Sequence, residues 1–123
     1  MTQQTVLIFA AIFGLLSVLF GAFGAHALKK ILSDEQLKSF ETGVKYQIYH
    51  ALILLFIGSH FKNPNLLMSW SFIIGIILFS FSIYGLVLSD AKGNKMKFLG
   101  PITPLGGLLL IIGWVLLLIE FIV

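Results

Sequence analysis

The stretch FETGVKYQIYHALILLFIGSHF, Phe40–Phe61, decides the fold because its two halves differ in character. The second half, Ile48–Phe61, is a mostly apolar run, whereas the first half carries acidic, basic, amide, phenol and imidazole side chains. The hydrocarbon core of a bilayer is about 30 Å thick, so a helix needs roughly 20 residues to span it. Ile48–Phe61 is too short for that, and this helix can cross a membrane only if its polar turns cross as well.

Three other segments are long enough and almost free of charge. Thr5–Leu28, Leu66–Ser89 and Thr103–Val123 contain no Lys, Asp or Glu except Glu120. The 123-residue chain is 59% hydrophobic and 11% charged, and its mean hydropathy of +1.04 lies outside the range of soluble domains. We therefore predict an all-α, multi-pass protein of the cell membrane. Its single membrane domain, 1–123, would hold four transmembrane helices at roughly 5–28, 34–61, 66–89 and 103–122.

Turn and capping residues separate these four helices. Ser33 and Gln36 have the spacing of a capping box, which predicts a helix that starts at Asp34. Pro64, between two asparagines, removes a backbone donor and separates the second helix from the third. Thr103 followed by Pro104 is typical of an N-cap and the first helical position, so we expect the fourth helix to begin there.

Lysine placement predicts which helix ends share a side of the membrane. Loops 29–38 and 90–102 carry six lysines, whereas the connection between the second and third helices holds Lys62 alone. Cytoplasmic loops of membrane proteins carry an excess of Lys and Arg. We therefore expect loops 29–38 and 90–102 in the cytoplasm and both chain termini outside.

Small side chains form stripes on three of the expected helices. Helices in lipid associate mainly through close packing, which small residues permit. These stripes predict helix contacts, either within one chain, which we favour, or between copies in a homo-oligomer. Their members are Gly14, Ser17, Gly21 and Gly24 on the first helix, Ser71, Gly75, Ser82 and Gly85 on the third, and Gly106 and Gly113 on the fourth.

The polar half of Phe40–Phe61 has a definite geometry if it is helical. Glu41, Lys45 and Tyr49 stack on one arc, and Tyr46 and His50 follow on the neighbouring arc. We expect these polar arcs to face protein or water. The opposite arc, expected to face lipid, carries only apolar side chains, namely Val44, Ile48, Ala51 and Leu55.

Two interpretations of these polar residues stay open. Either Lys45 extends to the membrane interface with Glu41 beside it, or both belong to a buried polar site, because an unpaired Lys at membrane depth costs roughly 2.5–3.5 kcal/mol. His50, near the middle of the bilayer, should be neutral. It either forms a structural pair with Tyr46 or serves as a ligand or proton carrier.

The start of the fourth helix offers free backbone amides. It lies at the same depth in the membrane as the C-terminal end of the first helix. Glu41, Tyr46 and His26 could converge on it, although a rigid loop before a helix explains the same residues. The candidate ligand or polar-network residues are therefore His26, Glu41, Lys45, Tyr46, Tyr49, His50 and Thr103.

No catalytic or metal-binding motif appears in the chain. It has no cysteine, and its three histidines lack metal-ligand spacing within any helix. We expect no catalytic residue, metal or cofactor. The net charge of +3 comes from lysines that flank membrane spans, which points to membrane orientation and not to nucleic-acid binding.

Three motifs follow one another along nearly the whole chain: GAFGAHALKKIL, FETGVKYQIYHALILL and LGPITPLGGLLLIIGW. Together they resemble the YgdD/YwdK-like small integral membrane proteins grouped as domain of unknown function 423. The resemblance implies a four-helix membrane protein and brings no activity, substrate or catalytic residue. It also implies a small residue between Ser80 and Ser82, where this chain has Phe81.

Three functional hypotheses follow. The favoured one is a non-enzymatic, compact and oligomeric bundle that serves as an interaction or lipid-binding module, with membrane lipids as partners. The alternative is an oligomeric transporter or channel for a small solute or ion that uses the polar residues of the second helix. An intramembrane acid–base enzyme is the third and least favoured.

Overall fold

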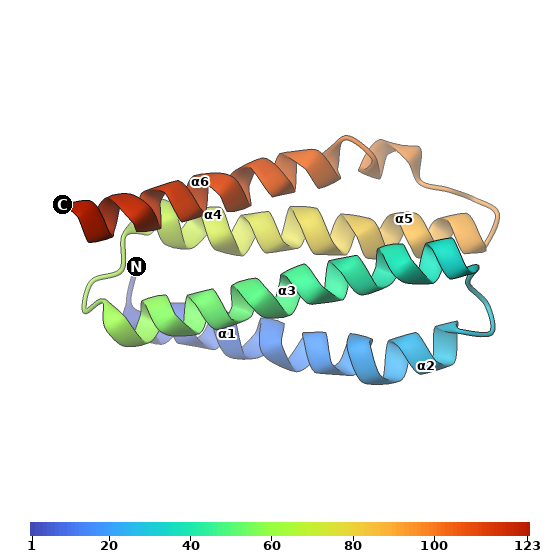
Figure 1. The fold of residues 1–123 in the computed structure, drawn as a ribbon, viewed down its shortest axis with the longest axis horizontal. Helices are drawn as coiled ribbons and strands as arrows, with labels where there is room; N and C mark the ends of the chain where they lie inside the picture. The colour runs from blue at the N-terminus through green and yellow to red at the C-terminus, as the bar shows by residue number, and fades with distance from the viewer.

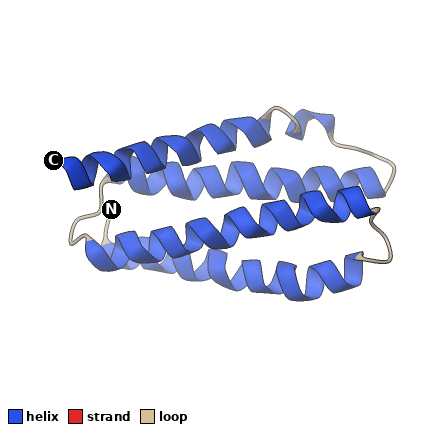
Figure 2. Cartoon of the chain, in the orientation of Figure 1, coloured by secondary structure: helices blue, strands red, loops and turns tan.

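The computed structural model describes residues 1–123 as a bundle of four antiparallel helices without strands (Figures 1 and 2). The bounds differ from the expected ranges by at most two residues at either end. Two of the four helices change pitch, through the π-helical segments η1 and η2. The elements are α1 (Gln3–Val18), η1 (Leu19–Gly24) and α2 (Ala25–Leu28), which form one helix, then α3 (Asp34–His60), then α4 (Leu66–Ile76), η2 (Ile77–Phe81) and α5 (Ser82–Ala91), again one helix, and finally the short 3₁₀ turn η3 (Lys97–Leu99) and α6 (Ile102–Ile122).

One helix starts at the capping residue that the sequence predicted, and another starts at a cap that it did not predict. The Ser33 hydroxyl accepts a hydrogen bond from the Gln36 amide, and the Gln36 side chain accepts one from the Ser33 amide, so the predicted capping box is confirmed. Asn65 caps α4. The prediction that Thr103 caps the fourth helix is wrong, because α6 begins at Ile102. The Thr103 hydroxyl instead lies 2.6 Å from that of Ser82, a bond between α6 and α5.

The helices alternate in direction, which sorts the connections into two ends. Both chain termini and the α3–α4 connection lie at one end of the bundle (Figure 1). The α2–α3 connection and the loop before α6 lie at the other end. The two lysine-rich loops therefore share one end of the molecule.

The helix α4–η2–α5 lies at the centre of the bundle. Half of the residues in its most apolar segment are buried, against 22% in Gln3–Leu28 and in Lys97–Ile122. It packs against α3 on one side and α6 on the other, while α3 also packs along α1. Because α3 and α6 both pack against this central helix, their outer faces leave a groove between them.

The small-residue stripes pack inside this single chain. Gly21 and Gly24 of η1 lie against Val44 and Phe40 of α3. In the pair formed by α4 and α6, Gly75 faces Leu110, Gly113 faces the Phe72 ring, and Gly106 lies against the backbone of η2. Gly14 contacts no neighbour through its Cα face. The stripes therefore no longer argue for contacts between copies.

Three helices are long and apolar enough to cross a membrane: Gln3–Leu28, Leu66–Ala91 and Lys97–Ile122. The helix α3 is as long, with 27 residues, but its first half carries Lys38, Glu41 and Lys45. The prediction of an all-helical membrane fold thus holds, whereas length and composition support three membrane spans and not four.

Candidate functional site

An apolar groove of about 950 Å³ runs between α3 and α6. Phe79 of η2 also lines it, because the central helix lies behind the gap. Gly107 lies on the α6 side, where no atom comes within 4 Å of the position that a Cβ would take. The groove is lined by Tyr46, Tyr49, His50, Leu52, Ile53, Phe79, Pro104, Gly107, Leu108, Leu110, Ile111 and Trp114.

A second hollow of about 640 Å³, the polar chamber, lies at the end with the lysine-rich loops. Pro104 lines both hollows, so they are neighbours at the first turn of α6. The chamber is lined by Ser33, Glu35, Gln36, Ser39 and Thr42 of the α3 end, Ile83, Leu86, Val87 and Asp90 of α5, and Lys95, Gly100, Thr103 and Pro104 of the segment that leads into α6.

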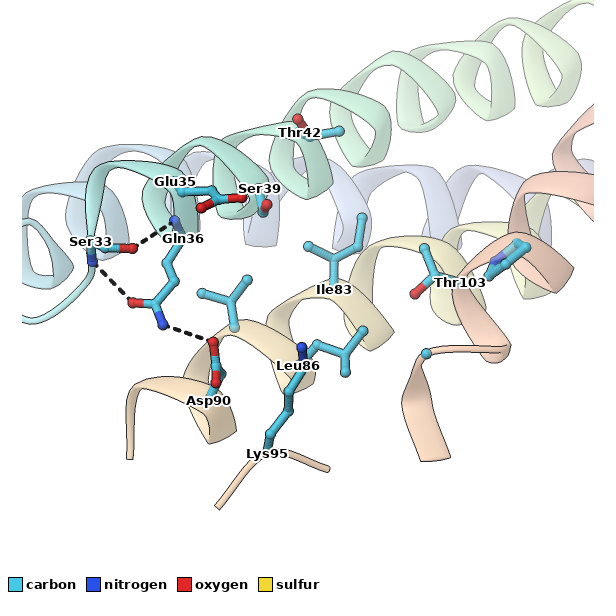
Figure 3. Close-up of a pocket in the computed structure, with 13 residues that line it drawn as sticks. Ser33, Glu35, Gln36, Ser39, Thr42, Ile83, Leu86, Asp90, Lys95 and Thr103 are labelled. Atoms are coloured by element: carbon cyan, nitrogen blue, oxygen red, sulfur yellow. Dashed lines mark hydrogen bonds between the residues drawn. The ribbon is translucent and has the colours of Figure 1, made fainter. Parts of the chain in front are cut away.

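Figure 3 shows how the charged groups of the polar chamber are held. The Gln36 amide nitrogen donates to the Asp90 carboxylate at 2.9 Å, which ties the start of α3 to the end of α5. The same Gln36 side chain completes the capping box, so its orientation is fixed at both ends. The Lys95 side chain extends from its loop toward Leu86, which places its ammonium group deeper in the chamber than Asp90.

His50 lies in the apolar groove with both ring nitrogens bonded. Its Nδ1 lies 2.7 Å from the Tyr46 carbonyl oxygen, and Trp114 donates its indole N–H to Nε2 over 3.1 Å. An indole is only a donor and a carbonyl only an acceptor, so His50 is neutral with the proton on Nδ1. The predicted partner Tyr46 contributes its backbone carbonyl and a stacked ring, not its hydroxyl. Trp114, which joins α6 to α3 through this bond, was not among the site residues predicted from the sequence.

A second buried polar group was also missed. Gln47, fully buried in α3, donates to the Phe13 carbonyl oxygen of α1 and accepts from the Tyr84 hydroxyl of α5. Ser80 of η2 donates to the carbonyl oxygen of Gly43, which lies one turn before Gln47 in α3. A buried amide must find hydrogen-bond partners. The signal in the sequence was the helical spacing that places Gln47 on the same face of α3 as Gly43 and Leu54.

The two charged residues that were predicted for the site, Glu41 and Lys45, line neither the apolar groove nor the polar chamber. Glu41 and Lys45 are exposed and line a small hollow of about 150 Å³ beside η1, so the interpretation that they form a buried polar site is wrong. Tyr49 is exposed too, although it borders the apolar groove. Ala51, expected to face lipid, is buried, so the predicted rotation of α3 is wrong at that position.

The other predicted site residues divide between the hollows. Tyr46 and His50 lie in the apolar groove, and Thr103 lies in the polar chamber. His26 is exposed and lines none of the three hollows. Glu41, Tyr46 and His26 therefore do not converge on the start of α6. No group of three His, Cys, Asp or Glu side chains is placed to hold a metal ion.

Four packed helices, three of them able to span a bilayer, define a helical membrane protein. The chain belongs to the family described as "Protein of unknown function (DUF423)", whose model matches residues 20–107. The resemblance found in the three sequence motifs is thereby confirmed.

Relatives extend the match to almost the full length. The chain is 42% identical over 121 residues to a UPF0382 membrane protein of Staphylococcus aureus, with 96% of this chain and 95% of the relative covered. It is 40% identical to the one of Staphylococcus haemolyticus over the same shares of both chains. The one of Staphylococcus saprophyticus is 38% identical, with 95% of this chain and 96% of the relative covered. No solved structure matches the chain.

Proposed function

We propose that this protein is a four-span membrane protein that binds a membrane lipid between α3 and α6. One observation carries the proposal: an apolar groove between two long helices has a polar chamber as its neighbour at one end, and Pro104 lines both. A lipid has the same division, with apolar chains attached to a polar headgroup. The groove volume of about 950 Å³ lies at the upper end of the usual range for small-molecule sites.

The direction of the chain supports a fourth span. The helices before and after α3 run the same way along the bundle, so α3 has to bring the chain back from one end to the other (Figure 1). If α1 and α4 both cross the bilayer, α3 crosses it as well. Its exposed Glu41 and Lys45 lie toward the end with the lysine-rich loops. There a long side chain reaches the interface.

Lysine distribution supports an orientation for this arrangement. The end that holds loops 29–38 and 90–102 carries six lysines and would face the cytoplasm of the cell membrane. Both termini would then lie outside. The polar chamber would open at the cytoplasmic leaflet.

Lipid is the natural occupant of the apolar groove. The groove opens on the outer surface of the bundle, where Leu52, Leu108 and Ile111 are exposed. Water cannot fill an apolar channel at membrane depth without losing hydrogen bonds. In a bilayer, the acyl chains of lipids are the apolar groups that are available to fill the groove.

The proposal concerns binding and involves no catalysis. A homo-oligomer remains a prediction, since the small-residue stripes that suggested it are used within one chain. Solute transport was suggested by Glu41, Lys45 and His50 together. The structure separates these residues, so no observation favours transport over lipid binding.

A substitution in the groove tests the proposal. Gly107→Leu would place a side chain in the groove, because Gly107 lines it and no atom lies within 4 Å of the Cβ position. Gly14→Leu is the matched control, since Gly14 of α1 is equally open, half-buried and outside the groove. We expect Gly107→Leu to lower the amount of lipid that co-purifies in mild detergent, measured by native mass spectrometry, while Gly14→Leu retains the wild-type amount. Equal lipid in both variants would rule out this groove.

A further inference from the structure

The polar chamber carries two carboxylates and one lysine from three separate segments. Glu35 comes from the first turn of α3, Asp90 from the end of α5, and Lys95 from the loop before α6. Asp90 accepts one hydrogen bond, from Gln36. The Lys95 ammonium and the Glu35 carboxylate take part in none of the side-chain hydrogen bonds within the chain and remain available to a ligand.

These groups lie in a definite order along the bundle. Glu35 and Asp90 occupy the outer mouth, at the ends of their helices. The Lys95 side chain extends inward toward Leu86, one helical turn deeper on α5 than Asp90 (Figure 3). Thr103 lies deeper still, in the first turn of α6, where its hydroxyl is bonded to Ser82, and the adjacent Pro104 also lines the apolar groove. From the membrane outward, the chamber therefore presents the ammonium group first and the carboxylate groups after it.

From this order we propose that the chamber recognises a phospholipid whose headgroup ends in a primary amine. With the acyl chains in the apolar groove, the ester oxygens lie at the level of Thr103, the phosphate meets Lys95, and the ammonium group reaches Asp90 and Glu35. Each charged group of the headgroup then faces one of opposite sign. This assignment rests on the proposed lipid site and specifies which lipid it selects.

Other headgroups fit this order less well. A headgroup that ends in glycerol offers no positive charge to the two carboxylates, while its phosphate adds a negative charge near them. A trimethylammonium group has the charge but no N–H, so it cannot form the charge-assisted hydrogen bonds that a primary ammonium makes. The amine-bearing phospholipid is the one that satisfies both carboxylates and the lysine.

Competition between headgroups tests the assignment. The intact protein is exchanged into mixed micelles with equal amounts of phosphatidylethanolamine, phosphatidylglycerol and phosphatidylcholine of identical acyl chains, and bound lipid is identified by native mass spectrometry. Because charge pairs at exposed sites are modest in strength, we expect phosphatidylethanolamine to be enriched roughly three- to tenfold over each competitor. The enrichment should shrink at high salt.

Matched variants connect the preference to the named residues. Glu35→Gln together with Asp90→Asn should abolish the enrichment over phosphatidylglycerol. Asp34→Asn together with Glu41→Gln also removes two carboxylates, neither of which lines the chamber, and should leave the enrichment unchanged. Lys95→Gln should reduce the bound amounts of phosphatidylethanolamine and phosphatidylglycerol alike, because both carry the phosphate.

The outcomes separate this inference from the lipid site itself. If bound lipid falls in Gly107→Leu but shows no headgroup preference, or favours phosphatidylglycerol, the lipid site stands and the amine assignment is wrong. Retention of the preference in the double carboxylate variant would also overturn the assignment. If Gly107→Leu leaves bound lipid unchanged, both proposals fail.

Discussion

Gln47 connects three helices through one amide group. Its nitrogen donates to the Phe13 carbonyl oxygen at 2.9 Å, and its oxygen accepts from the Tyr84 hydroxyl at 2.6 Å. Gln47 is fully buried and Tyr84 nearly so. Removal of one side chain therefore leaves the Gln47 oxygen or the Tyr84 hydroxyl without this bond in an apolar interior, which costs more than the bond itself contributes.

A double-mutant cycle measures this connection. Gln47→Leu and Tyr84→Phe should each destabilise the fold, by about 1–2 kcal/mol. The double variant should lose less than the sum of the two, because neither polar group is then left unpaired. Unfolding by a denaturing detergent in mixed micelles gives the free energies. Strict additivity would show that the 2.6 Å contact contributes no coupling between α3 and α5.

The bond from Trp114 to His50 predicts a difference between the two tryptophans of the chain. Trp114 and Trp70 are similarly exposed, at 44% and 40%, but only Trp114 donates a hydrogen bond to another side chain. Trp114→Phe should therefore lower the free energy of unfolding by about 1 kcal/mol, and Trp70→Phe by less.

Nitrogen-15 NMR provides a second readout of the same bond. We expect the proton of His50 to lie on Nδ1 in the wild type, since Nε2 accepts from Trp114. The Nε2 resonance should shift in Trp114→Phe and remain in place in Trp70→Phe. An Nε2-protonated imidazole in the wild type would contradict the bond.

At the level of elements, α6 approaches η2 more closely than any side chain at the contact permits. A Cβ at Gly106 would overlap the Phe79 amide nitrogen and the Leu78 carbonyl carbon, which are backbone atoms that cannot rotate away. The next residue, Gly107, faces the open groove. Gly106 therefore has no room for a side chain, whereas the adjacent Gly107 has room for a Cβ.

Alanine at each position tests this asymmetry. Gly106→Ala should destabilise the protein by about 2 kcal/mol, because it overpacks a backbone contact. Gly107→Ala should leave stability unchanged or raise it slightly, since alanine favours the helix. Thermal unfolding in detergent compares the two, and equal midpoints would mean that α6 does not pack against η2 at Gly106.

The sequence predicted the helices better than their rotations. Apolar length and the capping box of Ser33 locate the elements because these signals act within one segment. The rotation of α3 depends on which face its neighbours cover. A helical wheel gives angles between Glu41 and His50 but not the direction of the core. Residues that belong inside, such as Gln47 and Gly43, share the face of Leu54 at spacings of three and four, and that spacing was the usable signal.

The candidate site was only partly predictable for a related reason. Tyr46, Tyr49, His50 and Thr103 do line the two hollows. The polar chamber, however, joins α3, α5 and the loop before α6, and no local pattern indicates that Asp90 lies against Gln36. Such contacts between residues 54 positions apart arise from packing.

For the whole molecule, the central position of α4–η2–α5 connects fold and function. One helix packs against both α3 and α6, so these two remain apart and leave the groove open on the outer surface of the bundle. The close glycine contacts between α4 and α6 hold this arrangement in a single chain. The groove that we propose as a lipid site therefore forms without a second subunit.

The number of membrane crossings decides whether this arrangement sits in the bilayer as proposed. The helix α3 joins opposite ends of the bundle, so its two flanking connections lie at opposite ends of the molecule (Figure 1) and, if α3 crosses the bilayer, on opposite sides of the membrane. Because the chain has no cysteine, a single introduced cysteine reports on one position alone. Ile31 and Asn94 are exposed at the lysine-rich end, whereas Asn63 and Val123 are exposed at the other end.

We expect an impermeant thiol reagent added to intact cells to label Asn63→Cys and Val123→Cys but not Ile31→Cys or Asn94→Cys. Permeabilised cells should label all four, which controls for access and expression. The reverse pattern would retain four spans and invert the orientation. Labelling of Ile31→Cys and Asn63→Cys from the same side would mean that α3 does not cross. In that case the groove beside it could not lie along a lipid chain, because one of its two walls would lie outside the hydrocarbon layer.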